Sequence, residues 1–191
     1  RSYKADLGLS AQVELVLYRT DHDELGFSHY RYQQYHRGVK VEGGELLIHE
    51  KDGFVRTLNG KLVRGLNAGA DAALTAAEAI QQALDHTGAD GYMWEDAQAT
   101  AMLQRIKKDP QATFYPQPEL VLVDPSFEQN PADFQLAWSM VIYATNPHSK
   151  KQVFVNALTG AVAGESELLH DQNTPGTAQT KYSGTRTIIT D

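Results

Sequence analysis

The first third of the chain alternates apolar and polar residues with a period of two, which is the pattern of strands that bury one face. This alternation predicts strands over 12–18 and 27–35, separated by a polar loop over 21–26 that ends in glycine. A third and longer strand is predicted over 39–50, with a bulge at the glycine pair 43–44.

Three dipeptides are placed to reverse the chain around these strands. Arg37-Gly38 can turn it, and Asp52-Gly53 and Asn59-Gly60 are typical of tight hairpins, because both central residues tolerate a positive φ. The first ~60 residues are therefore expected to form an antiparallel β meander.

A linker and a helix are predicted next. Residues 65–73 are rich in Gly, Ala and Asn and show no periodicity. Thr75 and Glu78 have the spacing of a capping box at a helix start, and Gly88 is placed to end the helix. The apolar stripe of this helix consists of Ala76, Ile80, Ala83 and Leu84.

A second helix is predicted over 94–108, and Asp109-Pro110 would end it, because the residue before a proline disfavours helical geometry. Three- and four-residue spacing gives this helix one face, made of Ala101, Met102, Arg105 and Ile106.

Strands return after Pro118. Short apolar runs predict strands over 120–123 and 153–155, and the segment 156–160 is typical of a hairpin turn. The segment 134–143 alternates most clearly, and its apolar face consists of Phe134, Leu136, Trp138, Met140 and Ile142. Helices followed by an antiparallel sheet predict an α+β fold for this half.

The composition limits the classes of function. Among 191 residues, 24 are acidic and 17 are basic, so the formal charge is −7. This charge argues against nucleic acid or an anionic membrane as partner, since both require a basic surface. The absence of cysteine excludes disulfides and thiolate metal sites. No apolar run approaches the ~20 residues that span a bilayer.

Two patches carry a resemblance to a known family. Residues 28–50, followed by Leu58-Asn-Gly-Lys-Leu62, resemble the fungalysin/thermolysin propeptide module, through a Tyr/Gln-rich strand and the Gly38-Val39 turn. Residues 175–187 are similar to the opening strands of a mature thermolysin-like zinc peptidase. Between the patches, about 74–164 resembles a PepSY domain, through the segments 74–79, 94–96, 115–120 and 153–160.

This resemblance implies the N-terminal prosegment of a secreted thermolysin-like zinc metallopeptidase. It implies a propeptide-like module over 1–66 and a PepSY-like module of helices packed on an antiparallel sheet over 72–164. An extended tail over 165–191 would run into the start of the mature catalytic domain. In that family, both modules wrap the cognate catalytic domain, assist its folding as an intramolecular chaperone, block its cleft and are removed by autoprocessing.

The resemblance also implies a location and a precursor. We expect a secreted or extracellular protein, periplasmic in transit, that is a fragment of a longer chain whose signal peptide has been removed. The expected partner is the cognate thermolysin-like catalytic domain, in a non-covalent complex after processing. Nucleic acid and membrane are not expected as partners.

The catalytic motif of such a peptidase is missing from this sequence. A thermolysin-like enzyme needs His-Glu-x-x-His on a helix, with two imidazoles on zinc and a general base between them. Of seven histidines, only His49 precedes a glutamate, and Lys51-Asp52-Gly53 follows as a turn. We therefore expect no enzyme activity and no cofactor in this chain, with zinc and calcium belonging to the cognate catalytic domain. The alternative is a free-standing secreted PepSY-type inhibitor or binding module that acts in trans.

Three further clusters have ordinary structural interpretations that we favour. His29, His36 and His49 lie in neighbouring predicted strands, where a solvent-facing position or cross-strand polar pairing is favoured over a metal cluster. The tyrosines within 30–35 are expected to pack on the sheet rather than on nucleic acid. The acidic segment 21–24 lacks the spacing of a calcium loop.

The candidate functional site is the segment that begins at Glu165, which is also predicted as a last strand up to His170. A peptide bound beside an edge strand gains main-chain hydrogen bonds and places alternate side chains in pockets. Leu168 and Leu169 would supply apolar anchors, while carboxylate and imidazole groups could approach the partner's zinc. The candidate inhibitory, cleft-binding residues are Glu165, Glu167, Leu168, Leu169, His170 and Asp171. The alternative is an ordinary terminal strand followed by a linker.

Overall fold

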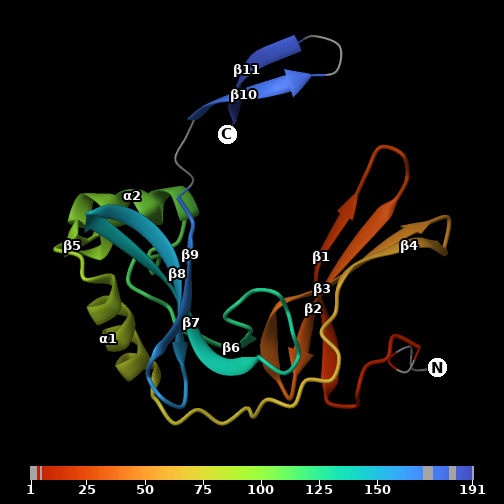
Figure 1. Cartoon of the computed structure of the whole chain (residues 1–191), viewed down its shortest axis with the longest axis horizontal. Helices are drawn as coiled ribbons and strands as arrows, with labels where there is room; N and C mark the ends of the chain where they lie inside the picture. The colour runs from red at the N-terminus through yellow and green to blue at the C-terminus, as the bar shows by residue number, and fades with distance from the viewer. Residues whose placement is uncertain (1–3, 5, 170–173, 181–183, 191) are drawn as a thin grey trace. The chain divides into compact units, whose positions relative to one another are not determined.

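The structure, a computed structural model, describes residue 4 and residues 6–169, and the backbone alone of residues 174–180 and 184–190. These residues form an α+β fold with a mixed sheet of nine strands and a separate two-stranded sheet (Figure 1). The main sheet has the order β1-β2-β3-β6-β7-β8-β9, with β4 paired to β3 and β5 paired to β7.

The elements of the first two thirds are β1 (Val13–His22), β2 (Ser28–His36), β3 (Val39–Lys51), β4 (Phe54–Lys61), α1 (Ala76–Thr87), β5 (Gly91–Tyr92), the 3-10 helix η1 (Met93–Glu95) and α2 (Ala97–Lys107). The remaining elements are β6 (Glu119–Val123), β7 (Gln135–Asn146), β8 (His148–Asn156), β9 (Val162–Glu167), β10 (Thr174–Thr180) and β11 (Gly184–Thr190).

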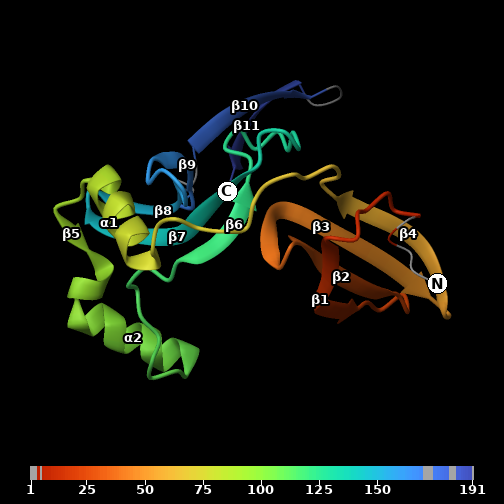
Figure 2. The same cartoon turned by 90° about the horizontal axis from the view of Figure 1, so that it is seen from below.

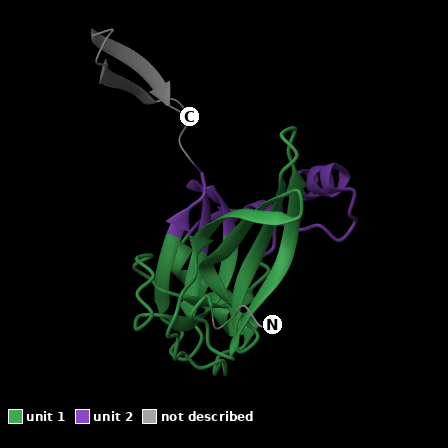
Figure 3. Ribbon diagram, turned by 90° about the vertical axis from the view of Figure 1, so that its right-hand side faces the viewer, with its two compact units in different colours: residues 1–88, 116–141, 153–165 green, residues 89–115, 142–152, 166–191 purple. Residues whose placement is uncertain are grey.

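The chain divides into two compact units, and each unit is made of three stretches that are separated in the sequence (Figure 3). The first unit contains residues 1–88, 116–141 and 153–165, and the second contains residues 89–115, 142–152 and 166–191. The modules over 1–66 and 72–164 and the tail over 165–191 stay predictions.

Strands β1 to β4 pair antiparallel in succession (Figures 1 and 2). The predicted turns at Arg37-Gly38 and Asp52-Gly53 are confirmed, and all four residues have φ between 50° and 79°. The predicted turn at Asn59-Gly60 is wrong, because both residues lie inside β4 opposite Leu47 and Leu46. A Cβ at Gly60 would collide with the Glu45 carbonyl, so glycine permits a close approach between two strands here.

The predicted bulge in β3 is confirmed. Gln33 pairs with Glu45 and Tyr35 pairs with Lys40, so residues 41–44 oppose Gln34 alone. Before the bulge, β3 pairs in parallel with β6, and after it β3 pairs with β4. One strand therefore joins two parts of the sheet in the first unit.

Helix α1 begins and ends as predicted. Thr75 and Glu78 form the reciprocal capping box, and Gly88 adopts a φ of 58° and donates its N–H to Leu84. Of the predicted stripe, Ala83 is fully buried and the other members are half-buried, while the buried Ala79 was missed.

Helix α2 differs from its prediction at its start and in its packing. Asp96 caps it by accepting the N–H groups of Gln98 and Ala99, so the predicted helix is divided into η1 and α2. None of the residues of α2 is buried, and Met102 and Ile106 are 55% and 66% exposed. The predicted face is therefore exposed, because helical spacing shows which residues share a face but not what covers it.

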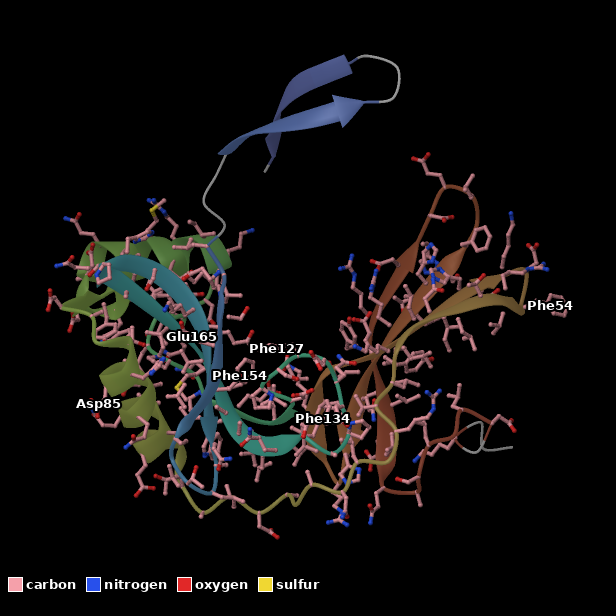
Figure 4. The ribbon with its side chains drawn as sticks, viewed as in Figure 1. Phe54, Asp85, Phe127, Phe134, Phe154 and Glu165 are labelled. Atoms are coloured by element: carbon pink, nitrogen blue, oxygen red, sulfur yellow. The ribbon has the colours of Figure 1, made fainter. Side chains whose placement is uncertain are left out.

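The core of the first unit lies on both sides of β7. One cluster includes Val41, Leu122 and Leu136, and a second contains Val121, Val123, Ala137 and Phe154. The ring of Phe127 meets that of Phe154 edge to face at 5.9 Å, and both side chains are labelled in Figure 4.

Strand β7 is buried more completely than its alternation predicted. Leu136, Met140 and Ile142 of the predicted apolar face are buried, and Trp138 is half-buried. Ala137 and Ser139 on the other face are buried too, so the prediction of one-sided burial is wrong. The reason is that both faces of β7 are covered, because Leu136 belongs to one buried core cluster and Ala137 to another.

The end of the chain has two features. The predicted turn over 156–160 is confirmed, since Asn156 donates to the Ala161 carbonyl at 2.8 Å and β9 follows. Strands β10 and β11 pair antiparallel, so the predicted extended tail contains a hairpin. In the described part of the chain, no helix is both long and apolar enough to cross a membrane.

Candidate functional site

The candidate segment is the end of an edge strand. Glu165 and Glu167 belong to β9, the last strand of the sheet order, and Leu168 and Leu169 follow it directly. Leu168 is half-buried and Leu169 is exposed. His170 and Asp171 lie outside the described residues.

Glu165 contacts a helix of its own chain. One of its carboxylate oxygens lies 3.1 Å from Nε2 of His86, in the last turn of α1 (Glu165 is labelled in Figure 4). Both side chains are more than a third exposed, so this pair adds little to stability. It does connect α1 to β9 within the first unit.

Glu167 binds backbone groups at the end of its strand. Its Oε1 accepts the N–H of Leu169 at 3.1 Å and the N–H of Lys150 in β8 at 3.4 Å. The N–H of Leu168 donates to the Lys150 carbonyl at 2.8 Å. Two of these contacts therefore hold the segment to Lys150 of β8, and the third, from Leu169 to Glu167, lies within the segment.

Lys150 is itself held by aromatic side chains of the second unit. Its Nζ lies 5.4 Å from the centre of the Tyr143 ring, a cation–π distance. Tyr143 packs edge to face on Phe114 at 5.1 Å. The side chain of the residue that pairs with Leu168 and Glu167 therefore lies against an aromatic pair.

The histidines of the propeptide-like strands pair across the sheet, as we favoured. The Nδ1 atoms of His29 and His49 lie 2.6 Å apart, and the outer nitrogens contact Asp23 and Asn59, both at 3.1 Å. The Phe27 N–H and the His29 ring, both hydrogen-bonded to the Asp23 carboxylate, hold the pKa of that group below its usual range. These residues line a pocket of about 320 Å³.

His36 does not join this pair, and its predicted solvent-facing or cross-strand polar role is wrong. It is buried at the other end of β2, and neither ring nitrogen has a hydrogen-bond partner among the described residues. Burial, helped by the neighbouring Arg37 charge, lowers the pKa of His36. Nowhere in the described residues do three or more His, Cys, Asp or Glu side chains gather as metal ligands would.

Sequence reasoning missed a buried clamp. The side-chain amide of Gln34 donates to the Val63 carbonyl at 2.7 Å and accepts the Val63 N–H at 2.9 Å. Gln34 is fully buried and Val63 nearly so. This clamp joins the segment after β4 to β2. A glutamine in a Tyr/Gln-rich strand gives no signal of such a role.

Apolar exposure in the first four strands was also missed. Every residue of β4 is exposed, including Phe54 at 67%. The large exposed apolar side chains of β1, β4 and the loop between β1 and β2 are Val16, Leu17, Tyr18, Leu25, Phe54, Val55 and Leu58. Alternation predicted which side chains share a face of the sheet. It did not predict that, among the described residues, these apolar side chains are left exposed.

Comparison with known proteins identifies the sequence motif that contains the first four strands. Residues 13–62, which span β1 to β4, match the Fungalysin/Thermolysin Propeptide Motif. The chain therefore carries a propeptide motif of fungalysin/thermolysin-type proteases. No curated protein matches the chain.

Among solved structures, the Bacillus megaterium YpeB C-terminal domain is similar to 82% of this chain, with 12% identity and a TM-score of 0.40. The match spans 57% of that chain. The likeness is distant.

Proposed function

We propose that this chain is the prosegment of a secreted thermolysin-like zinc peptidase, acting as its intramolecular chaperone and as an inhibitor that blocks its cleft. The observation that carries the proposal is the propeptide motif over 13–62, which covers all four of the first strands. Helices α1 and α2, followed by β6 to β9, form the part that we propose as the PepSY-like unit.

The physical basis of the chaperone role is selective binding. A prosegment that binds the folded peptidase domain but not its unfolded chain stabilises the folded state by mass action. A covalent tether raises the effective concentration of the prosegment at that domain. The exposed apolar side chains of β1 and β4 support a contact with a partner, because monomeric proteins rarely expose large apolar patches.

The contacts of the candidate segment reduce the number of residues that we propose for binding the cleft. Glu165 and Glu167 are engaged by His86 and by the Lys150 and Leu169 amides of their own chain. We therefore propose that these glutamates hold the segment in place. The cleft-binding part would begin at Leu169 and include His170 and Asp171, with an imidazole and a carboxylate in reach of the partner's zinc.

An inhibition experiment tests the proposal. The chain is added to its cognate mature zinc peptidase, and we expect tight competitive inhibition. A variant that ends at Leu168 keeps β9 and should lose most of the inhibition with an unchanged thermal melt. Equal inhibition by this shortened variant would show that the segment does not block the cleft.

Two further measurements test the remaining claims. The chain alone, incubated with casein and zinc, should hydrolyse nothing, since it lacks His-Glu-x-x-His. The denatured catalytic domain should regain activity in higher yield when the chain is present during refolding and is removed before the activity is measured. A yield that does not respond to the chain would contradict the chaperone role. A zinc-helix motif encoded downstream in the same reading frame would favour the prosegment over an inhibitor that acts in trans.

A further inference from the structure

The pairing between β8 and β9 ends in an unusual way at Lys150. In an antiparallel ladder, two directly hydrogen-bonded residues exchange both N–H to carbonyl bonds. Lys150 accepts the Leu168 N–H at 2.8 Å, but its own N–H donates to the Glu167 carboxylate at 3.4 Å. The carboxylate of Glu167 thus takes the position that the Leu168 carbonyl would have in a continuing ladder.

Strand β8 extends beyond Lys150, past the end of β9. It begins at His148, before Lys150 in the chain, whereas β9 ends at Glu167. Residues after Leu168 could therefore continue to pair along β8. The Glu167 side chain, which also accepts the Leu169 N–H at 3.1 Å, ends β9 before β8 runs out.

We propose that Glu167 is a positioning residue that fixes the point where the cleft-binding segment leaves the sheet. This inference rests on the proposed function, because it assigns the reach of the inhibitory segment. When the carboxylate is removed, the Lys150 N–H becomes available to the Leu168 carbonyl and pairing continues. Leu169 is then drawn along β8, and the cleft-binding segment leaves the sheet at a later residue.

The first test uses the chain alone and follows amide hydrogen exchange. In Glu167→Ala, the Leu169 amide loses its acceptor, and its exchange should become about tenfold faster, the effect of one lost hydrogen bond to a charged group. Glu167→Gln keeps an oxygen acceptor and should leave exchange near the wild-type rate. Glu165→Ala is the matched control and should not affect Leu169. An unchanged Leu169 rate in Glu167→Ala would overturn the proposal.

The second test measures inhibition of the cognate zinc peptidase. Glu167→Ala should inhibit about tenfold more weakly, whereas Glu167→Gln should stay close to the wild type. Insertion of Gly-Ser between Leu169 and His170 in the Glu167→Ala chain should restore inhibition, because it returns the lost reach.

The outcomes separate this inference from the proposed function. A glutamate that bound the partner's zinc would lose inhibition equally as Ala or Gln, and an insertion would not restore it, which would overturn the positioning role. Failure of the wild-type chain to inhibit, with a Leu169 amide that still responds to Glu167→Ala, would overturn the proposed function and leave the role of Glu167 in ending β9 intact.

Discussion

Strands β7 and β4 belong to the same sheet, and each pairs antiparallel with a neighbouring strand, β7 with β6 and β4 with β3. Their side chains nevertheless have opposite environments. In β7, Leu136 and Ala137 lie on opposite faces and both are buried. In β4, every side chain is exposed, although the strand pairs with β3 along its whole length. Backbone pairing therefore does not decide burial; the elements that cover each face of the sheet decide it.

This difference separates two tasks among the strands of the main sheet. Strands β6, β7 and β8 supply the packed residues that set the free energy of unfolding. Strand β4 is part of the propeptide motif and contributes exposed apolar surface instead. We expect substitutions in the buried strands to change stability, and substitutions in β4 to change partner binding.

The largest effect is expected from a matched pair of phenylalanines (Figure 4). Phe154 in β8 is 1% exposed, and Phe54 in β4 is 67% exposed. Phe154→Ala should lower the free energy of unfolding by about 3–5 kcal/mol, since it removes a buried ring and leaves a cavity. Phe54→Ala should change it by less than about 0.5 kcal/mol. Denaturant melts of both variants measure the contrast, and a similar loss in both would remove the distinction between the strands.

The buried clamp gives the next largest effect. Gln34→Ala would leave the buried N–H and carbonyl of Val63 without partners, at a cost of about 2–3 kcal/mol. Gln98→Ala, on the exposed face of α2, is the control and should be neutral. Chemical denaturation would report both values. A neutral Gln34→Ala would mean that the segment after β4 is held by apolar packing alone.

Local signals in the sequence predicted the elements well. The capping box of Thr75 and Glu78 and the turn at Asp52-Gly53 depend on neighbouring residues only, so they could be recognised without the fold. Asn59-Gly60 has the same local chemistry as a turn, but pairing with Leu46 and Leu47 placed it inside a strand. Contacts between distant residues decided that outcome, and they cannot be read from a dipeptide.

The candidate site shows the same limit. Position along the chain indicated the segment from Glu165 onward, and charge suggested that its carboxylates face a partner. In the structure, Glu165 contacts His86 and Glu167 accepts the Lys150 N–H, and these partners lie 79 and 17 positions away in the sequence. Such pairings follow from the order of strands in the sheet, which sequence periodicity does not specify.

Trp138 lies between the two extremes and should give a smaller effect. It belongs to the predicted apolar face of β7 but is only half-buried, and its Nε1 donates to the Leu74 carbonyl at 3.0 Å. Trp138→Phe keeps an aromatic ring and loses this bond, so we expect a loss of about 1 kcal/mol. Trp138→Ala should cost more, because it also removes packing against the first core cluster. Thermal melts would compare the two, and equal losses would show that the hydrogen bond contributes nothing.

The smallest effect concerns pH and the two ends of β2. His36 is buried without a described partner, and burial lowers its pKa from the ordinary value of 6.5. Below pH 6.5 the imidazole of His36 takes up a proton in the unfolded chain but stays neutral in the folded chain. The free energy of unfolding therefore decreases as the pH is lowered, until the pH reaches the folded pKa. Above that window both states are neutral and the effect vanishes. The carboxylates of Asp23 and Asp124 have lowered pKa values, so their contribution is lost only at more acidic pH.

Denaturation midpoints measured between about pH 7.5 and 5.5 cover the range in which an unperturbed imidazole takes up its proton, and a variant of His36 isolates its contribution. We expect the wild-type midpoint to fall as the pH falls. His36→Leu cannot take up a proton in either state and should flatten this dependence, whereas the exposed control His148→Gln should keep it. If His36→Leu keeps the full slope, the proton is taken up elsewhere in the chain. The end of β2 at His36 and the end where His29 contacts Asp23 would then differ in packing alone.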